Sequence, residues 1–249
     1  MDPKTTKPLF DFLKRNSSWN EAFQKNEYLR TLAHCQSDSA RLMQLLFATV
    51  HTQAKPSMAN LAKFWRCLQK LEESQGSSLV QFTKSLERNS KPKKLEIGPW
   101  DRLYLALCAT PGWGPKTSAL FVKNTIRIHQ GPKKFHFWHD ANVTNPALNA
   151  DRIHLPVDAV ITDIFGRMGL KSANFKNIND HLWESYSPTE VLVWDDLWYW
   201  GFFNQTVIGG RRESGWNSEK FWSQISTPKT YENQIKRLST QFRKLIQTG

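Results

Sequence analysis

The chain has 249 residues and 39% of them are hydrophobic, which is enough for a buried core and excludes an intrinsically disordered chain. Its formal net charge of +12 suits a polyanionic partner, because each Lys or Arg that contacts a phosphate releases counterions. The three cysteines, Cys35, Cys67 and Cys108, lie far apart, which argues against an iron–sulfur cluster, a zinc ribbon or a disulfide framework.

The N-terminal 15 residues contain four basic residues and no apolar stretch, so we expect no secretory signal peptide. No apolar run approaches the roughly 20 residues that a transmembrane helix needs. We therefore expect an intracellular protein, in the cytoplasm or nucleoid, with no membrane partner.

Apolar residues recur at helical spacing along most of the chain and strand signals are weak, so we predict an all-α fold. Asp38 or Ser39 can cap the first predicted helix, and Ser57 can cap the second. Ser187-Pro188-Thr189-Glu190 reads as a capping box with Pro at the first helical position. The predicted helices span about 38–50, 57–71, 79–86, 100–108, 115–126, 160–168, 188–204 and 228–245. Loops are expected at 87–94, 129–154 and 209–212.

A tight turn is predicted between the helices at 100–108 and 115–126. Thr110-Pro111-Gly112-Trp113-Gly114 contains two glycines, and Pro115 stands where the next helix begins. Such an arrangement directs consecutive backbone N–H groups at an anion, here a DNA phosphate, without reading base sequence. The alternative is an ordinary turn between two helices.

Two side chains could carry chemistry. Asp158 precedes an amphipathic helix whose dipole would help to keep it ionised, and a carboxylate beside a sugar could stabilise an oxocarbenium-like transition state. The alternative is a plain helix N-cap. An amine at Lys116 could attack a sugar C1′ and form a Schiff base, if its pKa were lowered. The alternative is a lysine that contacts a phosphate or solvent.

Aromatic side chains could form a base pocket. Phe135 and Trp138 lie in the segment 129–154, where an aromatic ring could stack on an extruded base. Packing of these rings onto their own domain is the alternative. Trp198 is a third candidate, although its helical spacing from Trp194 is more typical of a core. We expect no metal site at His136, His139 and Asp140, because no further paired ligand lies nearby.

Taken together, two segments resemble the signature of the helix-hairpin-helix base-excision DNA glycosylases. They are Pro111-Gly112-Trp113-Gly114-Pro115-Lys116-Thr117 and Leu155-Pro156-Val157-Asp158-Ala159-Val160. The resemblance implies that the hairpin, at about 100–128, grips the DNA backbone and that Asp158 is the essential carboxylate. A Lys at the position of Lys116 marks the family members that also nick the abasic site.

A third segment, residues 45–54, resembles the family's early helix, which ends in a Gln-Ala loop. By that resemblance Gln53 fills the gap that a flipped-out base leaves in the stack. A polar residue at a helix C-terminus is the alternative reading of Gln53. The expected DNA-binding residues are Gln53, Lys55, Gly112, Trp113, Gly114 and Thr117.

The resemblance spans about residues 40–205 and has two departures. Lys116 and Asp158 are separated by 42 positions, more than is usual in the family, although the archaeal 8-oxoguanine glycosylases also lengthen this segment. The cysteine cluster of the endonuclease III branch is missing. We expect one glycosylase unit over 1–249, with the terminal helices packed together, a central helical subdomain at about 40–170, an insertion at 129–154, and the active-site cleft between two helical subdomains.

The expected function is a DNA glycosylase that flips out and excises a modified base, with AP lyase activity through Lys116 as an option. Oxidised guanine is the first expected substrate, and alkylated purines are a second. A hypermodified phage base, which would make the enzyme an antiviral factor, and a non-catalytic DNA-binding module are the alternatives. We expect a monomer acting on double-stranded DNA with no cofactor, although the hairpin could hold a monovalent cation.

Overall fold

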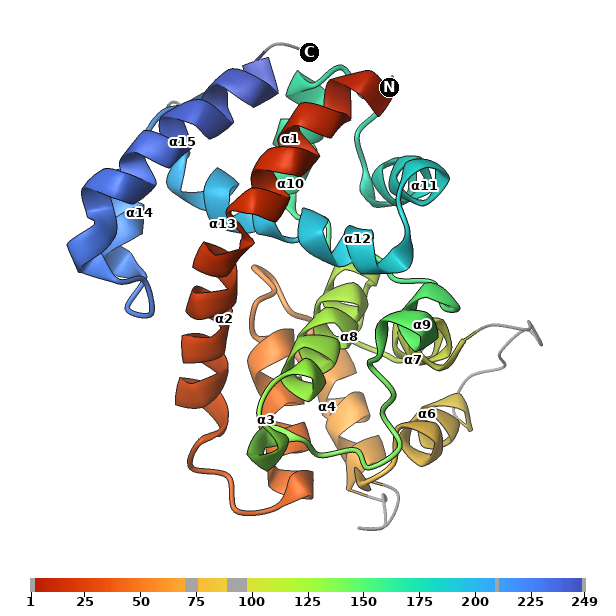
Figure 1. Ribbon diagram of the computed structural model, residues 1–249. Helices are drawn as coiled ribbons and strands as arrows, with labels where there is room; N and C mark the ends of the chain where they lie inside the picture. The colour runs from red at the N-terminus through yellow and green to blue at the C-terminus, as the bar shows by residue number, and fades with distance from the viewer. Residues whose placement is uncertain (1–2, 70–75, 89–97, 209–210, 248–249) are drawn as a thin grey trace. The chain divides into compact units, whose positions relative to one another are not determined.

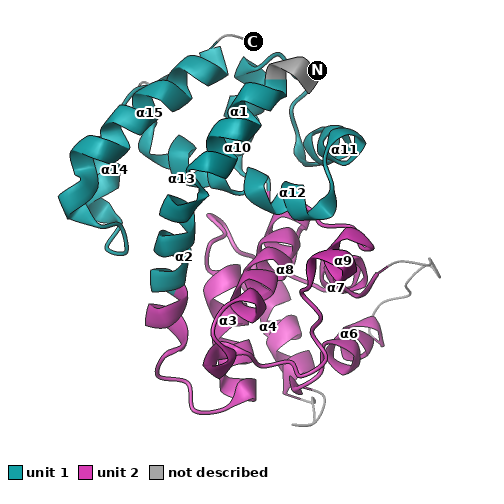
Figure 2. Cartoon of the chain, viewed as in Figure 1, with its two compact units in different colours: residues 1–27, 157–249 teal, residues 28–156 magenta. Residues whose placement is uncertain are grey.

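The computed structural model describes residues 3–69, 76–88, 98–208 and 211–247. Helices dominate these ranges, and the strands form a single two-stranded sheet, so the prediction of an all-α fold is confirmed (Figure 1). The chain divides into two compact units (Figure 2): unit 1 comprises 1–27 and 157–249, and unit 2 comprises 28–156. Unit 2 and the expected central subdomain at about 40–170 overlap along most of their length. The expected cleft between two subdomains stays a prediction.

Unit 2 is a helical unit built around buried aromatic side chains. Its elements after the end of α2 (Ser17–Leu32) are α3 (Asp38–Val50), α4 (Met58–Leu68), α6 (Leu79–Glu87), α7 (Pro99–Cys108), α8 (Pro115–Gln130), the 3-10 helix η1 (Lys133–Phe135) and α9 (Asn145–Asn149). Helix α7 packs against α6 and α8, and α8 also packs against α3. The rings at most 2% exposed are those of Phe64, Phe82, Trp100, Phe121, Phe137 and Trp138. These rings form the core of unit 2 together with its buried aliphatic side chains.

Unit 1 joins the N-terminal and C-terminal segments. Its elements are α1 (Pro3–Arg15), the first part of α2, α10 (Ala159–Arg167), α11 (Phe175–Ser185), α12 (Pro188–Trp194), α13 (Asp196–Phe203), β1 (Gln205–Ile208), β2 (Arg211–Ser214), α14 (Ser218–Ser223), the 3-10 helix η2 (Lys229–Tyr231) and α15 (Glu232–Gln247). Helix α1 packs against α12 and α15. Gly201 allows α13 to lie directly on α10, because a Cβ there would approach Val160 Cγ1 to 2.5 Å.

Several helix boundaries differ from the sequence prediction. Ser37, rather than Asp38 or Ser39, caps α3, since its side chain accepts a hydrogen bond from Ala40 N at 3.1 Å. Ser57 caps α4 as predicted, and the capping box at Ser187 is confirmed.

Further differences lie in the C-terminal part of the chain. The single helix expected over 188–204 is two helices, α12 and α13, separated at Asp195. The prediction of a loop at 209–212 is wrong for residues 211–212, because residues 211–214 pair with 205–208 as antiparallel strands. The expected positions Leu71, 89–94 and 209–210 lie outside the described residues.

The segment 129–154 packs against the rest of unit 2, and two of its carboxylates cap the first turns of two helices. The Asp140 carboxylate accepts hydrogen bonds from Leu79 N at 2.7 Å and Val80 N at 3.2 Å at the start of α6. Asp151 does the same for α7, accepting from Trp100 N at 2.7 Å and Asp101 N at 3.1 Å. Both carboxylates satisfy N–H groups that a helix leaves open at its first turn. The segment 129–154 therefore stabilises the first turns of α6 and α7.

Candidate functional site

The predicted turn between α7 and α8 is fixed by backbone geometry. Gly112 has a φ of +89°, a conformation that favours glycine, and a Cβ there would approach Leu61 Cδ2 to 2.8 Å. Trp113 N donates to Thr110 O at 3.2 Å, which closes the turn. Gly114 then caps α8 with Pro115 at the first helical position, as predicted.

The start of α8 offers unpaired backbone donors. Within the described ranges, no hydrogen-bond acceptor is recorded for the N–H groups of Gly114, Lys116 and Thr117. A Cβ built on Gly114 meets no atom within 4 Å, so the space beside this cap is open. Because the N–H groups and the helix dipole both favour negative charge at this end, these N–H groups can donate hydrogen bonds to a phosphate oxygen.

Gln53 contacts the turn directly. Its Nε2 donates to Gly112 O at 3.0 Å, so two residues 59 positions apart in the sequence are brought together within unit 2. We name Gln53, Gly112, Gly114, Lys116 and Thr117 the hairpin site. In this conformation the amide of Gln53 is engaged with the turn, and its expected role in filling a gap in DNA stays a prediction.

Three aromatic predictions need correction. Trp113 is 5% exposed and its indole packs edge-on against Phe64 and Phe121, with ring centroids 5.3 and 5.7 Å away. It anchors the turn in the core and offers no indole face to DNA. Phe135 is 7% exposed and Trp138 is 2% exposed. Trp138 Nε1 also donates to Gly76 O at 3.0 Å, so packing onto the domain, the alternative considered for these rings, is what the structure has.

Other side chains on unit 2 face solvent. Lys55 is exposed in the loop after α3, where a phosphate contact is feasible. Phe47, six positions before Gln53, is 51% exposed, and its ring centroid lies 4.0 Å from that of His51. Phe47 was not among the predicted site residues, and helical spacing alone does not reveal that its ring is exposed on α3.

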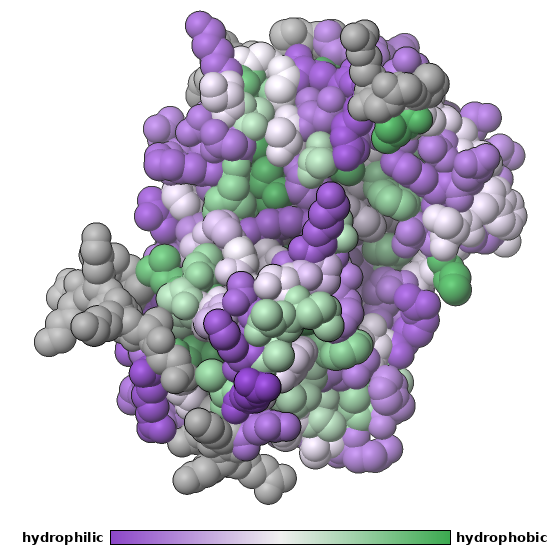
Figure 3. Space-filling view, turned by 180° about the vertical axis from the view of Figure 1, so that it is seen from behind, coloured by the Kyte–Doolittle hydropathy of each residue, from purple (hydrophilic) through white to green (hydrophobic). Residues whose placement is uncertain are grey.

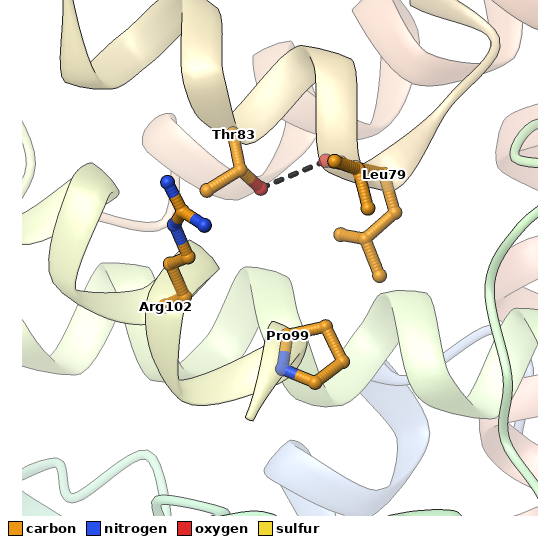
Figure 4. Close-up of a pocket in the computed structure, with 5 residues that line it drawn as sticks. Leu79, Thr83, Pro99 and Arg102 are labelled. Carbon is orange, nitrogen blue, oxygen red and sulfur yellow. Dashed lines mark hydrogen bonds between the residues drawn. The ribbon is translucent and has the colours of Figure 1, made fainter. Parts of the chain in front are cut away.

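A surface pocket of about 210 Å³ lies between α6 and α7 in unit 2 (Figure 4). The residues that line it are Leu79, Val80, Thr83, Pro99 and Arg102. The Arg102 guanidinium is held by Glu87 through two hydrogen bonds of 2.7 and 2.6 Å, and Thr83 Oγ1 donates to Leu79 O at 2.8 Å. The polar groups at this pocket are thus already bonded, and no predicted site residue lines it.

In unit 1, Asp158 is the N-cap of α10. Its Oδ1 accepts hydrogen bonds from Val160 N at 2.8 Å and Ile161 N at 2.9 Å, which is the geometry of the alternative considered for this residue. No partner for its Oδ2 is recorded among the residues that the structure describes. A cap that uses one oxygen leaves the other able to face a substrate.

Hydrogen bonds connect the β1–β2 hairpin to α10. Gln205 Nε2 donates to Asp163 Oδ2 at 3.1 Å, and Arg212 Nη1 donates to Gln205 Oε1 at 2.9 Å. Arg167 Nη2 donates to the backbone oxygen of Arg212 at 2.8 Å. These bonds fix the Arg212 guanidinium relative to α10.

A second cation, Lys220 on α14, is influenced by the charges of both Arg212 and Asp158. Burial lowers the pKa of Lys220, and the positive charge of Arg212 lowers it further, whereas the Asp158 carboxylate raises it. Lys220 Nζ lies 5.0 Å from the centroid of the Phe202 ring, in a cation–π contact. Phe202 in turn stacks on Trp198, with centroids 5.1 Å apart and an interplanar angle of 21°.

The charges of Asp158 and Arg212 act on Lys220, which contacts Phe202, which in turn stacks on Trp198. We name these five residues the Asp158 cluster. The structure brings the predicted Trp198 and Asp158 into one unit, and Trp198 is half-buried rather than part of the core. Sequence reasoning missed Phe202, Arg212 and Lys220. The signal that could have found them is weak, because they share no spacing with Asp158 and lie on three different elements.

Lys116, the predicted nucleophile, has a different setting. It lies in the first turn of α8, half-buried, and forms no hydrogen bond or ion pair with any residue of the described ranges. It belongs to unit 2, and Asp158 belongs to unit 1.

Hydrophilic side chains cover most of the face drawn in Figure 3, and apolar side chains form smaller areas between them. None of the described helices is both long enough and apolar enough to cross a bilayer. In the same ranges, no group of three or more His, Cys, Asp and Glu side chains is arranged to hold a metal ion. Comparison with family models, with curated proteins and with solved structures gives no match for this chain.

Proposed function

We propose that this protein is a DNA glycosylase, which excises a modified base by cleaving its N-glycosidic bond. One observation carries the proposal. The Asp158 carboxylate is held at a helix N-terminus through one oxygen, and its charge acts on Lys220, whose amine lies over the Phe202 ring that stacks on Trp198. That combination matches the needs of a reaction at a deoxyribose whose base is extruded and whose phosphates are anionic.

Four members of the Asp158 cluster have a role in this reaction. Departure of the base leaves positive charge on the sugar, which the Asp158 carboxylate stabilises. Arg212 is placed to bind a phosphate that flanks the sugar. The stacked rings of Trp198 and Phe202 present an aromatic surface to the extruded base.

The hairpin site supplies the grip on double-stranded DNA. Its open N–H groups at the start of α8 bind a phosphate, and the net charge of +12 adds attraction along the backbone. Neither contact reads a base, so substrate choice falls to the aromatic surface. Oxidised guanine is the first substrate to test, followed by alkylated purines and hypermodified phage bases.

The test is a panel of duplex oligonucleotides, each with one modified base and one labelled strand. After incubation with the full-length protein, hot alkali cleaves the strand at every abasic site. We expect cleavage at the modified position of at least one duplex and none with Asp158→Asn. Full activity of Asp158→Asn on the cleaved duplex contradicts the proposed role of this carboxylate.

A non-catalytic DNA-binding module is the second candidate, and the cap geometry favours it. Asp158 Oδ1 already accepts the two bonds that a purely structural N-cap makes. The same panel separates the two candidates. Tight binding to every duplex with no base released from any of them supports the binding module and rejects the glycosylase.

A further inference from the structure

Two neighbouring helices of unit 2, α3 and α4, share an exposed aromatic surface (Figure 1). The Phe47 ring is 51% exposed, and its centroid lies 4.0 Å from that of His51 and 6.2 Å from that of Trp65. His51 is exposed and Trp65 is half-buried. We name Phe47, His51 and Trp65 the aromatic face. Single apolar side chains are ordinary on a protein surface, whereas contiguous exposed rings mark a place where a partner binds.

The aromatic face is anchored to the core of unit 2. Trp65 packs against the fully buried ring of Phe64, with centroids 5.0 Å apart, and Phe64 in turn packs against Trp113 of the hairpin turn. On α3, His51 Nδ1 donates to Phe47 O at 2.8 Å, which holds the imidazole against the end of the helix. The rings are therefore in place before a partner arrives, so that binding has few side chains to order.

The charge around the aromatic face is positive. Residues 39–69 contain no Asp or Glu and have four cationic side chains, Arg41, Lys55, Lys63 and Arg66. Arg41 pairs with Asp38 at 2.9 Å, and the other three are exposed. Two of these three, Lys63 and Arg66, flank Trp65 on α4. Aromatic rings beside exposed cations fit a partner that carries flat rings and negative charge together.

We propose that the aromatic face binds the unpaired bases of single-stranded DNA. An unpaired base stacks on an aromatic ring through its π-face, while the phosphates lie near the three exposed cations. A duplex cannot make this contact, because its bases are stacked on one another and only their edges are open in the grooves. A second copy of this chain would bring the same cations to the surface and would be repelled.

The aromatic face and the hairpin site are joined through both helices. Gln53, two positions after His51, donates to Gly112 O at 3.0 Å, and a Cβ at Gly112 would approach Leu61 Cδ2 on α4 to 2.8 Å. One DNA molecule that is duplex in one part and single-stranded in another can therefore occupy both sites of unit 2. The choice of DNA rests on the proposed function, whereas the stacking contact needs neither Asp158 nor base release.

Fluorescence anisotropy tests the proposal with the full-length protein and two labelled probes, an oligothymidylate, which forms no paired structure, and a blunt duplex. Phe47→Leu keeps an apolar side chain but removes the ring. We expect it to raise the Kd for the single strand about ten-fold and to leave the Kd for the duplex unchanged. Phe47→Tyr, which keeps a ring, should bind as the wild type does. Trp222→Leu, at a position 54% exposed in unit 1, is the matched control and should have no effect.

The cations are tested with the same single strand. Arg66→Ala should raise the Kd about three-fold through the loss of one phosphate contact. Lys176→Ala, at an exposed position on α11 of unit 1, should leave the Kd unchanged. An unchanged Kd in Arg66→Ala would contradict the assignment of a polyanion to this surface.

Photocrosslinking locates the contact independently of any substitution. The oligothymidylate carries iododeoxyuridine, which attaches to a nearby aromatic side chain under ultraviolet light, and peptide mass spectrometry maps the attachment. We expect crosslinks at Phe47, His51 or Trp65. Crosslinks confined to other parts of the chain would place the single strand elsewhere and overturn the proposal.

Three further results overturn it: no binding of the single strand by the wild type, the same Kd for Phe47→Leu and the wild type, or a dimer in sedimentation that Phe47→Leu dissociates. None of them bears on base release, which the modified-base panel measures separately. Binding of the single strand through Phe47 with no base released supports the aromatic face and rejects the glycosylase. Base release without such binding supports the glycosylase and rejects the aromatic face as a DNA contact.

Discussion

The hairpin site of unit 2 and the Asp158 cluster of unit 1 differ in how they are assembled. The hairpin site comes almost entirely from one short stretch, in which Gly112 has a positive φ and the donors are backbone N–H groups. The Asp158 cluster draws side chains from α10, α13, β2 and α14. The first suits a contact that ignores base identity, and the second suits chemistry at one atom of the sugar.

Under the proposed function, DNA binding and catalysis depend on two separate groups of residues, one in each unit. Because backbone N–H groups remain when a side chain is replaced, the hairpin site should lose DNA binding mainly when its fold is lost. The Asp158 cluster should lose activity when one functional side chain is replaced, even if the fold is retained. The following predictions exploit that difference, starting with the largest expected effect.

Asp158→Asn should abolish most base release while leaving DNA binding and folding intact. The Asn side-chain oxygen can still accept the hydrogen bonds from Val160 N and Ile161 N, but it carries no charge for the sugar cation. We expect a loss on the order of 10³-fold in the single-turnover rate. Asp180→Asn, on an exposed part of α11, is the matched control and should retain the full rate.

Trp113→Ala should destabilise unit 2 by about 3–5 kcal/mol, because it removes a buried indole that packs against Phe64 and Phe121. DNA binding should fall with the folded fraction. Urea unfolding followed by circular dichroism measures the change. Trp222→Ala, at a position 54% exposed, should alter stability by less than about 1 kcal/mol. Equal effects of the two variants would show that Trp113 is no anchor.

Acid should weaken unit 2 through His129. Burial and, to a smaller extent, the charge of His136 lower the pKa of His129 to about 4, although Asp140 acts in the opposite direction. Because the folded pKa lies below the unfolded value, the stability is complete above pH 6.5 and is lost as the pH falls toward 4. The loss amounts to about 3 kcal/mol.

Free energies of unfolding measured at several pH values test this dependence. His129→Phe, which keeps an aromatic ring without a titrating group, should flatten the curve between pH 6.5 and 4. Exposed His34→Gln should leave it as steep as in the wild type. If His129→Phe has no influence on the slope, the acid sensitivity has another origin.

Gln53→Ala should weaken DNA binding modestly, because it removes the bond from Nε2 to Gly112 O that braces the turn. A single neutral hydrogen bond contributes about 1 kcal/mol, so we expect about a five-fold rise in Kd by fluorescence anisotropy. Gln69→Ala, an exposed position at the end of α4, is the control. A defect seen only with duplexes that carry a modified base would point instead to gap filling.

Lys55→Ala should have the smallest effect, visible mainly in salt dependence. One lost phosphate contact should reduce the slope of log K against log salt concentration by about 1. Anisotropy titrations at several salt concentrations give this slope, and Lys176→Ala should leave it unchanged. An unchanged slope in Lys55→Ala removes this lysine from the DNA contact.

Local sequence patterns predicted the hairpin site, whereas the positions of the other site residues depend on tertiary packing. Glycine and proline report backbone geometry directly, so the turn at 110–114 and the start of α8 at Pro115 were readable from the sequence. Asp158 was readable as a residue before a helix, but the positions of Arg212 and Lys220 depend on how β2 bonds to α10 and how α14 packs against α13.

The base-pocket predictions for Phe135 and Trp138 are contradicted by the burial of both rings, which the local sequence does not reveal. Phe135 and Trp138 lie in a segment whose sequence is typical of a loop. Only its hydrogen bonds to Gly76, Leu79 and Trp100, which are distant in the chain, show that this segment packs on unit 2 and caps α6 and α7. Sequence composition cannot reveal which side of such a segment is buried, because burial depends on partners far away in the chain.

The most direct measurement is the mass-spectrometric detection of free base released in a single turnover from the modified-base panel. The wild-type protein should release one base per cleaved site, with the sugar left in the strand, and Asp158→Asn should release almost none while binding the same duplex. Release of no base from any duplex, or equal release by the wild type and Asp158→Asn, contradicts the account.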